Sequence, residues 1–389
     1  MSARAVPTVG ILGGGQLARM LALAGVPLGA RFLVLDDAPG ACAGDVAPVI
    51  AAGWQDFDQL ASFAEQVDVV TFDFENVPAA SVDWLAARVP VFPNARALAV
   101  AQDRISEKAL FAEIGLPTPA HAAVDDRAGL ERAIEAIGTP AILKTRRLGY
   151  DGKGQFRLHS TADADAAWAA LGEQGAAYGL VLEALVPFRR ELSVIAVRGR
   201  DGAFRAWPLV QNWHDRGILS MSLAPANVPS AIADTALAHA RALAEKLDYV
   251  GVFALELFDD GERLLGNEMA PRVHNSGHWS IEGALTSQFE NHVRAVLGLP
   301  LGDTACDGVS LMFNWIGALP DAGAVLAASD AHWHDYGKSP REGRKVGHAT
   351  VRAPTLEALL PRARAMATAL GREAQLAPVE NWLNKASNA

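Results

Sequence analysis

Cysteine is scarce in this sequence, where Cys42 and Cys306 are the two among 389 residues. Two cysteines so far apart cannot form the dense disulfide framework of small secreted proteins, so we expect free thiols in a reducing compartment. No apolar run approaches the roughly 20 residues that a membrane span requires, and no long apolar stretch precedes Gly13 as it would in a signal peptide. We therefore predict a cytoplasmic protein with no membrane partner.

Positive charge is also in deficit, because the 44 acidic residues outnumber the 34 lysines and arginines and give a net charge of −10. This balance argues against a nucleic-acid partner, since broad neutralisation of a phosphate backbone needs many cations. A local basic cluster can still hold a single phosphate. Half of the residues are apolar, as in ordinary globular proteins, and the length suits two or three domains.

Apolar and helical stretches alternate over the first hundred residues. Strands are expected over 8–12, 31–35 and 67–72, with a helix over 16–28. This βαβ pattern predicts a parallel sheet with helices on both faces. One helix is then expected over about 95–114, where the turn-rich linker 115–119 stops it.

Two further units follow in the pattern. The first has strands over 141–145 and 179–183 and a helix over 163–171. The second is larger, with strands over 191–197, 252–258 and 263–268 and a helix over 231–247. The tail from 355 to 370 has apolar residues at helical spacing, which predicts an amphipathic helix. The whole chain is thus of the α/β class.

A glycine turn, Gly13-Gly14-Gly15-Gln16-Leu17-Ala18, lies between the first strand and the first helix. Glycines there let a ligand approach the backbone, and the helix start offers free N–H groups to an anion. With Asp36 and Asp37 after the next strand, the pattern passes for a dinucleotide fingerprint. A tight structural turn without any ligand is the alternative interpretation.

A second glycine-rich segment follows Lys144 at the end of a strand. Residues 147–155 hold three glycines among cations, which describes a loop able to fold over polyphosphate. The strand lysine adds a point charge for phosphate oxygens. The spacing matches neither a Walker A loop nor a kinase loop. A hairpin tip with solvated charges is the alternative.

Two carboxylates lie in apolar strands of the third unit. Burying the charge of Glu256 among hydrophobic neighbours costs free energy unless the carboxylate is paired or binds a metal. Glu268 ends the next strand, beside Asn267. Two carboxylates and an amide suit Mg²⁺, which prefers hard oxygen ligands. Structural salt bridges remain the alternative, and a strict two-residue hairpin places Glu256 opposite Leu265 instead of Glu268.

Two polar segments complete the candidate site. Residues 270–279 contain arginine, histidine, asparagine and serine close together, just beyond the acidic strands. Such a density of polar residues is typical of the rim of a site. Residues 338–345 gather cations on a Pro/Gly turn of an acidic protein. The second segment is interpreted either as a solvated loop or as a phosphate clasp.

Together the strand lysine, the glycine-rich loop, the paired glutamates and the preceding Rossmann-like unit resemble the ATP-grasp superfamily. Within it, residues 13–20 (GGGQLARM), 149–155 (GYDGKGQ), 267–279 (NEMAPRVHNSGHW) and 343–348 (GRKVGH) are similar to the N5-carboxyaminoimidazole ribonucleotide synthase family. The similarity extends over nearly the whole chain in the same order. It implies an ATP-grasp fold, with a Rossmann-like domain over 1–103, a small α+β lid domain over 104–185 and a larger α+β domain over 186–389.

The resemblance also implies a reaction. ATP, bicarbonate and 5-aminoimidazole ribonucleotide would give ADP, phosphate and the N5-carboxylated ribonucleotide through carboxyphosphate, in purine biosynthesis. The implied cofactors are ATP and Mg²⁺, with Mn²⁺ as an alternative, and the implied assembly is a homodimer. Rival hypotheses are a formate-using ribonucleotide ligase of the same superfamily, an NAD-dependent oxidoreductase built on the glycine turn, and a non-catalytic nucleotide-binding protein.

Site residues follow from matching the family's motifs to this sequence. The matches to nucleotide contacts are Arg104, Lys144, Gly149, Tyr150, Asp151, Gly152, Lys153, Gly154, Gln155, Glu183, Ala184, Leu185, Val186, Glu191, His214, Asn267 and Glu268. The matches to metal ligands are Glu256 and Glu268, and those to ribonucleotide contacts are Gln16, Leu17, Glu75, Asn275, Lys338, Arg344 and Lys345. Lys144 and Arg272 are expected to neutralise charge, and Asp151 and His274 are the candidates for proton transfer.

Overall fold

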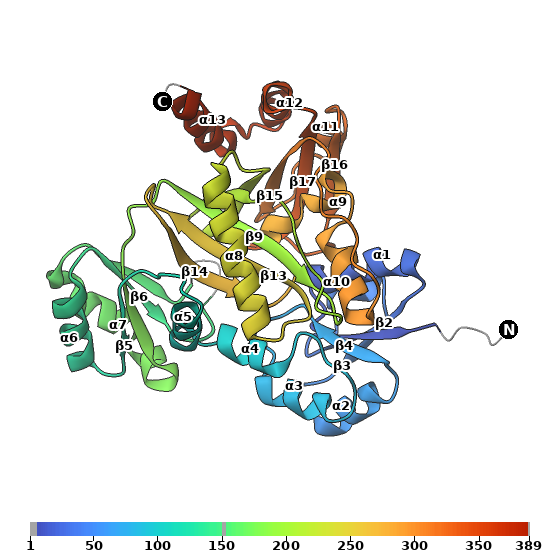
Figure 1. Cartoon of the computed structure of the whole chain (residues 1–389), viewed down its shortest axis with the longest axis horizontal. Helices are drawn as coiled ribbons and strands as arrows, with labels where there is room; N and C mark the ends of the chain where they lie inside the picture. Colours follow the sequence, from blue (N-terminus) through green and yellow to red (C-terminus); the bar gives the residue numbers. More distant parts are fainter. Residues whose placement is uncertain (1–5, 150–152, 388–389) are drawn as a thin grey trace.

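The computed structural model describes residues 6–149 and 153–387, whose strands form three sheets (Figure 1). The first sheet is parallel and has the order β3-β2-β1-β4, as the βαβ pattern predicted. Its elements are β1 (Thr8–Leu12), α1 (Gln16–Gly25), β2 (Arg31–Asp36), β3 (Val49–Ala51), α2 (Phe57–Ala64), β4 (Val69–Phe72) and α3 (Ala79–Ala86), with 3₁₀ turns at Val26–Leu28 and Cys42–Asp45.

Two predicted helices differ in the structure. The first ends at Gly25 and continues as a 3₁₀ turn containing Pro27, which has no N–H for a helical hydrogen bond. The prediction of one helix over 95–114 is wrong, because α4 (Ala95–Ala101) and α5 (Arg104–Glu113) are separate helices. Asp103 breaks them apart by adopting an extended conformation and capping α5, where its side chain accepts from the N–H groups of Ile105 and Ser106.

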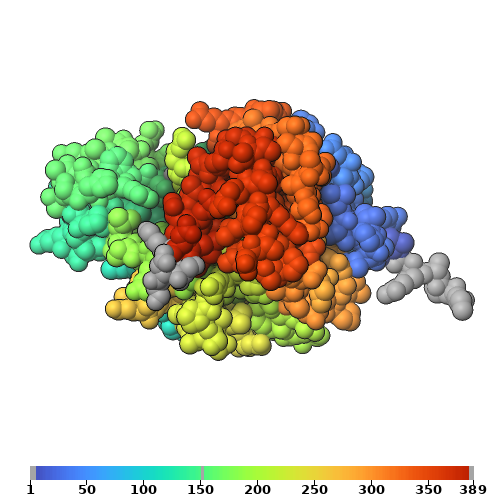
Figure 2. Space-filling model, turned by 90° about the horizontal axis from the view of Figure 1, so that it is seen from above, coloured from blue at the N-terminus to red at the C-terminus, as the bar shows by residue number. Residues whose placement is uncertain are grey.

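The second sheet is antiparallel and belongs to a small lobe. Its order is β5-β8-β6-β7, formed by β5 (His121–Val124), α6 (Arg127–Ile137), β6 (Ala141–Thr145), β7 (Gln155–Leu158), a 3₁₀ turn at Thr161–Asp163, α7 (Ala164–Tyr178) and β8 (Leu180–Ala184). The lobe has its own hydrophobic core, which includes Leu130, Leu143 and Leu182. Figure 2 shows the lobe in green, standing out from one side of the body.

The third sheet forms the centre of the molecule and has the order β14-β13-β9-β11-β12-β15-β17-β16, with β10 paired to β9. Its strands are β9 (Arg190–Arg198), β10 (Phe204–Ala206), β11 (Val210–Asp215), β12 (Ile218–Ala224), β13 (Gly251–Asp259), β14 (Leu264–Ala270), β15 (Val309–Ile316), β16 (Ala331–Asp335) and β17 (Lys345–Ala353). Its helices are α8 (Ser230–Lys246), α9 (Ser280–Gly283), α10 (Gln288–Leu297), α11 (Ala322–Leu326), α12 (Leu356–Ala369) and α13 (Glu373–Ser387), with a 3₁₀ turn at Asn275–Gly277.

Strand β13 is apolar at nearly every position because it is covered on both faces. Phe253 and Leu255 pack in the core that contains α8, whereas Val252 and Ala254 pack in the core that contains α1 and α10. Successive side chains of a strand point to opposite faces, so Glu256 lies on the face turned towards α10 and the first sheet.

The first and third sheets share one hydrophobic core, which joins residues of α1 to residues of β9, β13 and α10. His292 of α10 strengthens this connection, because its Nδ1 accepts from the N–H of Val252 at 3.0 Å and its Nε2 lies 2.8 Å from Thr71 Oγ1. The predicted tail helix is confirmed as α12, whose Leu359 and Ala363 are buried. In the described part of the chain, no helix has the length and apolar character needed to cross a membrane.

Domain boundaries at 103/104 and 185/186 stay predictions. The strands of the three sheets occupy 8–72, 121–184 and 190–353. Helix α5 lies between the first two groups, and its Leu110 and Phe111 pack in the core beneath α8.

Candidate active site

A cavity of about 1170 Å³ lies where the three sheets meet. All predicted site residues among the described residues line it: Gln16, Leu17, Glu75, Arg104, Lys144, Gly149, Lys153, Gly154, Gln155, Glu183, Ala184, Leu185, Val186, Glu191, His214, Glu256, Asn267, Glu268, Arg272, His274, Asn275, Lys338, Arg344 and Lys345. Tyr150, Asp151 and Gly152 lie outside the described residues. The fold therefore gathers side chains from across the chain, while their individual roles stay predictions.

The two candidate metal carboxylates face each other across neighbouring strands. Glu256 of β13 pairs in register with Glu268 of β14, so the register of a strict two-residue hairpin is wrong. The turn is longer, since Asp259 pairs with Leu264, and a β-bulge shifts the register between Glu256 and Leu257. Asn267 is the extra residue of this bulge. Although it is consecutive with Glu268, both side chains line the cavity, because a bulge re-aims side chains that strict alternation would separate.

The two carboxylates have different electrostatic environments. Burial, and then the charge of Glu268, raises the pKa of Glu256 to about 8. Burial also opposes ionisation of Glu268, but Arg104 and Lys144 outweigh it and hold the pKa of that carboxyl below its usual range. The Arg104 Nη1 atom lies 3.1 Å from Glu268 Oε2. Two close carboxylates of which one resists ionisation form a site that an additional cation would stabilise.

The donor set around these carboxylates fits Mg²⁺. Glu256, Glu268 and the amide of Asn267 supply hard oxygen atoms, and Asn267 Nδ2 lies 3.5 Å from Glu256 Oε2. Among the described residues, no group of three or more His, Cys, Asp or Glu side chains is arranged for a metal ion. A magnesium ion here would therefore share its coordination sphere with nucleotide phosphate, as Mg²⁺ commonly does in nucleotide sites.

Lys144, at the end of β6, is part of a buried ion cluster that the sequence analysis did not anticipate. Its Nζ lies 3.0 Å from Glu183 Oε2, and Lys108 Nζ of α5 lies 3.2 Å from Glu183 Oε1. Burial opposes ionisation of Glu183, but Lys144 and Lys108 lower its pKa to about 2. Burial lowers the pKa of Lys144 and Glu183 opposes this effect. Glu183 thus acts as an internal counter-ion beside the predicted phosphate site.

A carboxylate that the sequence analysis did not name, Glu107 of α5, lies behind Glu268. Its Oε1 accepts from the N–H of Met269 at 2.6 Å, and burial, followed by the charge of Glu268, raises its pKa to about 8. No sequence signal marks Glu107, because an acidic residue in the first turn of a helix is normally solvated there.

The predicted ribonucleotide contacts form another corner of the cavity. Lys338 donates a hydrogen bond to Gln16 Oε1 of α1, which joins the 338–345 turn to the first sheet. Arg272 Nη2 lies 2.6 Å from Glu75 Oε2. This corner combines two cations from segments next to the third sheet with two acceptors from segments next to the first, an arrangement suited to a small anionic ligand with polar groups.

The glycine turn before α1 is already filled by the protein's own carboxylates. Asp36 Oδ2 accepts from the N–H of Gly14 at 2.5 Å, and Asp73 Oδ2 accepts from the N–H of Ala18 at 3.1 Å. Gly13 has φ +97°, and a Cβ there would lie 1.8 Å from Asp73 Oδ1. Burial raises the pKa of Asp73 to about 6. These contacts occupy backbone donors that a dinucleotide pyrophosphate would need, which disfavours the oxidoreductase hypothesis.

The predicted nucleotide end of the cavity combines a polar pair with an aromatic wall. His214 is hydrogen-bonded to Glu191. Burial opposes protonation of His214, but Glu191 outweighs it and raises the histidine's pKa. Phe188 and Phe258 stack with their ring centroids 4.7 Å apart, and Phe188 and Phe258 both line the cavity. A flat ring with a hydroxylated sugar matches this mixture of apolar and acceptor groups.

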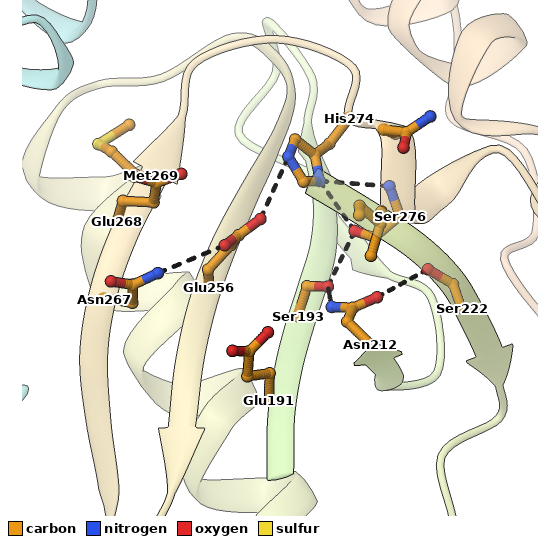
Figure 3. A network of polar contacts seen from close by, with 12 residues as sticks. Glu191, Ser193, Asn212, Ser222, Glu256, Asn267, Glu268, Met269, His274 and Ser276 are labelled. Carbon is orange, nitrogen blue, oxygen red and sulfur yellow. Dashed lines mark hydrogen bonds and ion pairs between the residues drawn. The ribbon is translucent and has the colours of Figure 1, made fainter. Parts of the chain in front are cut away.

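His274 lies beside the metal candidates, with Nε2 3.2 Å from Glu256 Oε1 (Figure 3). Burial, and then the charge of Arg272, holds the pKa of His274 well below its usual range. The adjacent Asn275 is tied into the core, where its Nδ2 donates to Asn314 Oδ1 at 3.1 Å. Both side chains are therefore held rigidly at the cavity wall.

Three family models match consecutive parts of the chain. A ribonucleotide synthetase preATP-grasp domain matches residues 6–102, an ATP-grasp domain matches residues 109–289, and a phosphoribosylaminoimidazole carboxylase C-terminal domain matches residues 310–362. The order agrees with the predicted fold class, an ATP-grasp fold preceded by a Rossmann-like domain.

Relatives of known name match almost end to end. The N5-carboxyaminoimidazole ribonucleotide synthase of Pseudomonas aeruginosa is 52% identical over 92% of this chain and 99% of its own. The crystal structure of the Thermus thermophilus synthetase has a TM-score of 0.88 at 52% identity, covering 93% of this chain and 98% of that one. An Aspergillus clavatus synthase, in complex with ADP and 5-aminoimidazole ribonucleotide, has a TM-score of 0.86 at 32% identity, covering 94% and 99%. The chain belongs to the N5-carboxyaminoimidazole ribonucleotide synthase family of ATP-grasp ligases.

Proposed function

We propose that this chain carboxylates 5-aminoimidazole ribonucleotide with bicarbonate at the cost of ATP, forming the N5-carboxyamino product, ADP and phosphate in purine biosynthesis. The observation that best supports this proposal is the cavity itself. It joins the cation Lys144, the opposed pair Glu256–Glu268 and the Gln16–Lys338 corner in one space. The family's name and the ligands of the Aspergillus clavatus synthase support the same reaction.

ATP is proposed to bind between the lobe and the third sheet. The backbone of 184–186 would contact adenine beside the Phe188–Phe258 stack, and Glu191 would accept from the ribose hydroxyls. Lys144 and Arg104 would face the phosphates, with Lys153 joining from the loop. Lys144 lies at the end of β6 in the lobe, whereas Arg104 pairs with Glu268 of the third sheet, so ATP would bridge the two.

Magnesium is proposed to bind at Glu256 and Glu268, with Asn267 beside them and Mn²⁺ as a substitute. The raised pKa of Glu256, caused by burial and then by the charge of Glu268, supports this assignment, because a cation would favour the ionised form. When bound, the metal would neutralise charge that develops on the transferred phosphoryl group.

The ribonucleotide is proposed to bind at the opposite corner. Lys338, Arg344 and Lys345 would hold its phosphate, since a cation cluster on a turn suits a small phosphate ester. Gln16 and Leu17 at the start of α1, together with Glu75, would contact the rest of the molecule. Because both candidate sites line one cavity, the exocyclic amine would meet the activated bicarbonate within the same space.

Bicarbonate is a poor electrophile, so its activation as carboxyphosphate precedes attack by the amine. Arg272 lies near the ribonucleotide corner, paired with Glu75, and would neutralise the bicarbonate anion. Positioning and charge neutralisation are what phosphoryl transfer requires of a protein. The loop 149–155 is proposed to close over the intermediate and exclude water; its central residues 150–152 lie outside the described part.

The decisive experiment measures phosphate release from ATP with the complete mixture and with bicarbonate or ribonucleotide omitted in turn. Release should require both, and the product should be the carboxylated ribonucleotide. Release that needs formate instead of bicarbonate would favour the formate-using ligase, and stabilisation by NAD without any ATP turnover would favour the oxidoreductase.

The homodimer and the cytoplasmic location implied by the resemblance also stay proposals. Sedimentation velocity tests the homodimer.

A further inference from the structure

A row of buried polar side chains continues behind the metal candidates into the third sheet. Glu268 pairs with Glu256, and Glu256 pairs in turn with Ser193 of β9. Ser193 is fully buried, as are Ser222 and Ser276. Buried hydroxyl groups are costly unless they form hydrogen bonds. In Figure 3, Asn212 links Ser222 to Ser193, and Ser193 contacts Ser276, which lies beside His274.

The hydrogen bonds in this row have one direction. Ser222 Oγ donates to Asn212 Oδ1 at 2.7 Å, and Asn212 Nδ2 donates to Ser193 Oγ at 2.6 Å. Ser193 Oγ donates to Ser276 Oγ at 2.8 Å. Each hydroxyl has a single proton to give. Because Ser276 accepts from Ser193, its own proton is left for His274 Nδ1, which lies 2.8 Å away.

A second donor also requires His274 Nδ1 to act as an acceptor. The backbone N–H of Ser276 donates to His274 Nδ1 at 3.3 Å. A backbone N–H is always a donor, so this contact does not depend on how the hydroxyl protons or the Asn212 amide are assigned. A nitrogen that accepts from an N–H and an O–H carries no proton itself. The proton of the neutral imidazole is then on Nε2, which lies 3.2 Å from Glu256 Oε1.

We propose that Ser222, Asn212, Ser193 and Ser276 are positioning residues that fix His274 as the Nε2–H tautomer, so that His274 donates a hydrogen bond to Glu256. His274 thereby orients the Glu256 carboxylate, and its Nε2 is not available to take a proton from the substrate. This differs from the proton-transfer role expected from the sequence. The catalytic consequence rests on the proposed function, whereas the tautomer itself does not.

The tautomer is measured directly by ¹⁵N NMR of the full chain labelled at histidine. The His274 signals are assigned by their absence in His274→Gln. In the native protein, Nδ1 should have the chemical shift of an unprotonated ring nitrogen and Nε2 that of a protonated one. Signals of the Nδ1–H tautomer would overturn the proposal. The measurement needs no turnover, so it stands or fails separately from the proposed reaction.

Two variants test whether the row sets the tautomer. Asn212→Asp keeps the shape but replaces the donor to Ser193 with an acceptor, so the row should reverse and let Ser276 Oγ accept from His274 Nδ1–H. Ser276→Ala removes the hydroxyl donor and leaves only the longer backbone contact. Both should increase the Nδ1–H population. Ser310→Ala is the matched control, because Ser310 is a buried serine of the same sheet that lies away from the cavity.

Activity provides the second readout. The two variants should lower kcat roughly three- to tenfold, as expected for the loss of one hydrogen bond, with little change in KM for ATP. His274→Gln, which keeps an N–H donor near the Nε2 position, should retain more activity than His274→Ala. Equal losses in these two, or an unchanged tautomer in both Ser276→Ala and a folded Asn212→Asp, would refute the proposal. If Asn212→Asp does not fold, the Ser276→Ala spectrum decides.

Discussion

Glu183 is a buried charge of the lobe, and its removal gives a quantitative test. The carboxylate is 3% exposed and is held between Lys144 and Lys108. Its pKa falls from an ordinary 4.5 to about 2, because the two lysines outweigh the opposing effect of burial. At roughly 1.36 kcal/mol per pH unit, a shift of this size corresponds to about 3 kcal/mol in favour of the folded state.

Glu183→Gln keeps the side-chain shape but removes the carboxylate that pairs with both buried lysines. Removing one partner of a buried ion pair typically costs about 3–5 kcal/mol, in line with the figure from the pKa. We expect a loss of that order in the free energy of unfolding at pH 7, measured by urea denaturation together with hydrogen exchange at the amides of β8.

The contribution of Glu183 to stability depends on pH in a definite direction. Because the folded-state pKa of Glu183 is depressed by its lysine partners, its contribution is fully present above about 4.5 and is lost as the pH falls towards 2. The difference between the native protein and Glu183→Gln should therefore shrink below pH 4.5. An ATP analogue should stabilise the variant more than the native protein, because phosphate replaces the missing negative charge.

A matched control comes from the surface of the same lobe. Asp165 lies 2.6 Å from Arg127, but its side chain is 91% exposed. Asp165→Asn should change the stability little, since exposed ion pairs contribute little. A loss below about 1 kcal/mol for Glu183→Gln at pH 7 would refute the reasoning, as would a difference that does not vary with pH.

Three further predictions concern the rest of the cavity. Glu268→Gln and Glu256→Gln should abolish turnover with the fold intact, since loss of a catalytic metal costs several kcal/mol of barrier; near-normal rates at saturating Mg²⁺ would exclude the metal assignment. Lys338→Ala and Arg344→Ala should each weaken ribonucleotide binding about tenfold or more, and calorimetry showing equal losses for ATP would move this cluster out of the substrate site. Burial, followed by the charge of Glu268, raises the pKa of Glu107 to about 8, so the free energy of unfolding of the native protein should fall as the pH rises from 4.5 to 8. Between pH 4 and pH 9, the stability of Glu107→Gln relative to the native protein should therefore rise by up to about 5 kcal/mol. Parallel pH profiles of the two proteins in urea titrations would contradict this.

Much of the fold was predictable because its signals are local. The strands at 8–12 and 141–145 match the structure residue for residue, since apolar runs bounded by turns identify them. The break between α4 and α5 was missed although its signal is present, because Asp103 followed by Ser106 and Glu107 is a recognisable helix start. Helix α13 and the strands near the C-terminus were not predicted, since their patterns are weak.

The candidate residues taken from the sequence line one cavity, but the contacts among them were not predictable. Motif resemblance placed Glu256 and Glu268 together, whereas simple hairpin geometry did not, because a bulge at Asn267 has no distinctive sequence pattern. The ion cluster of Lys108 with Glu183 joins residues 75 positions apart, and the Ser193–Ser276 contact spans 83. Such contacts depend on tertiary packing, which local periodicity does not contain.

The shared core of the first and third sheets has a mechanical consequence. His292 and α1 lock these two parts into a single rigid block, so the Gln16–Lys338 corner is already assembled before any ligand arrives. The lobe with Lys144 has a core of its own. We therefore expect any closure of the lobe to accompany ATP binding, which would then carry the entropic cost.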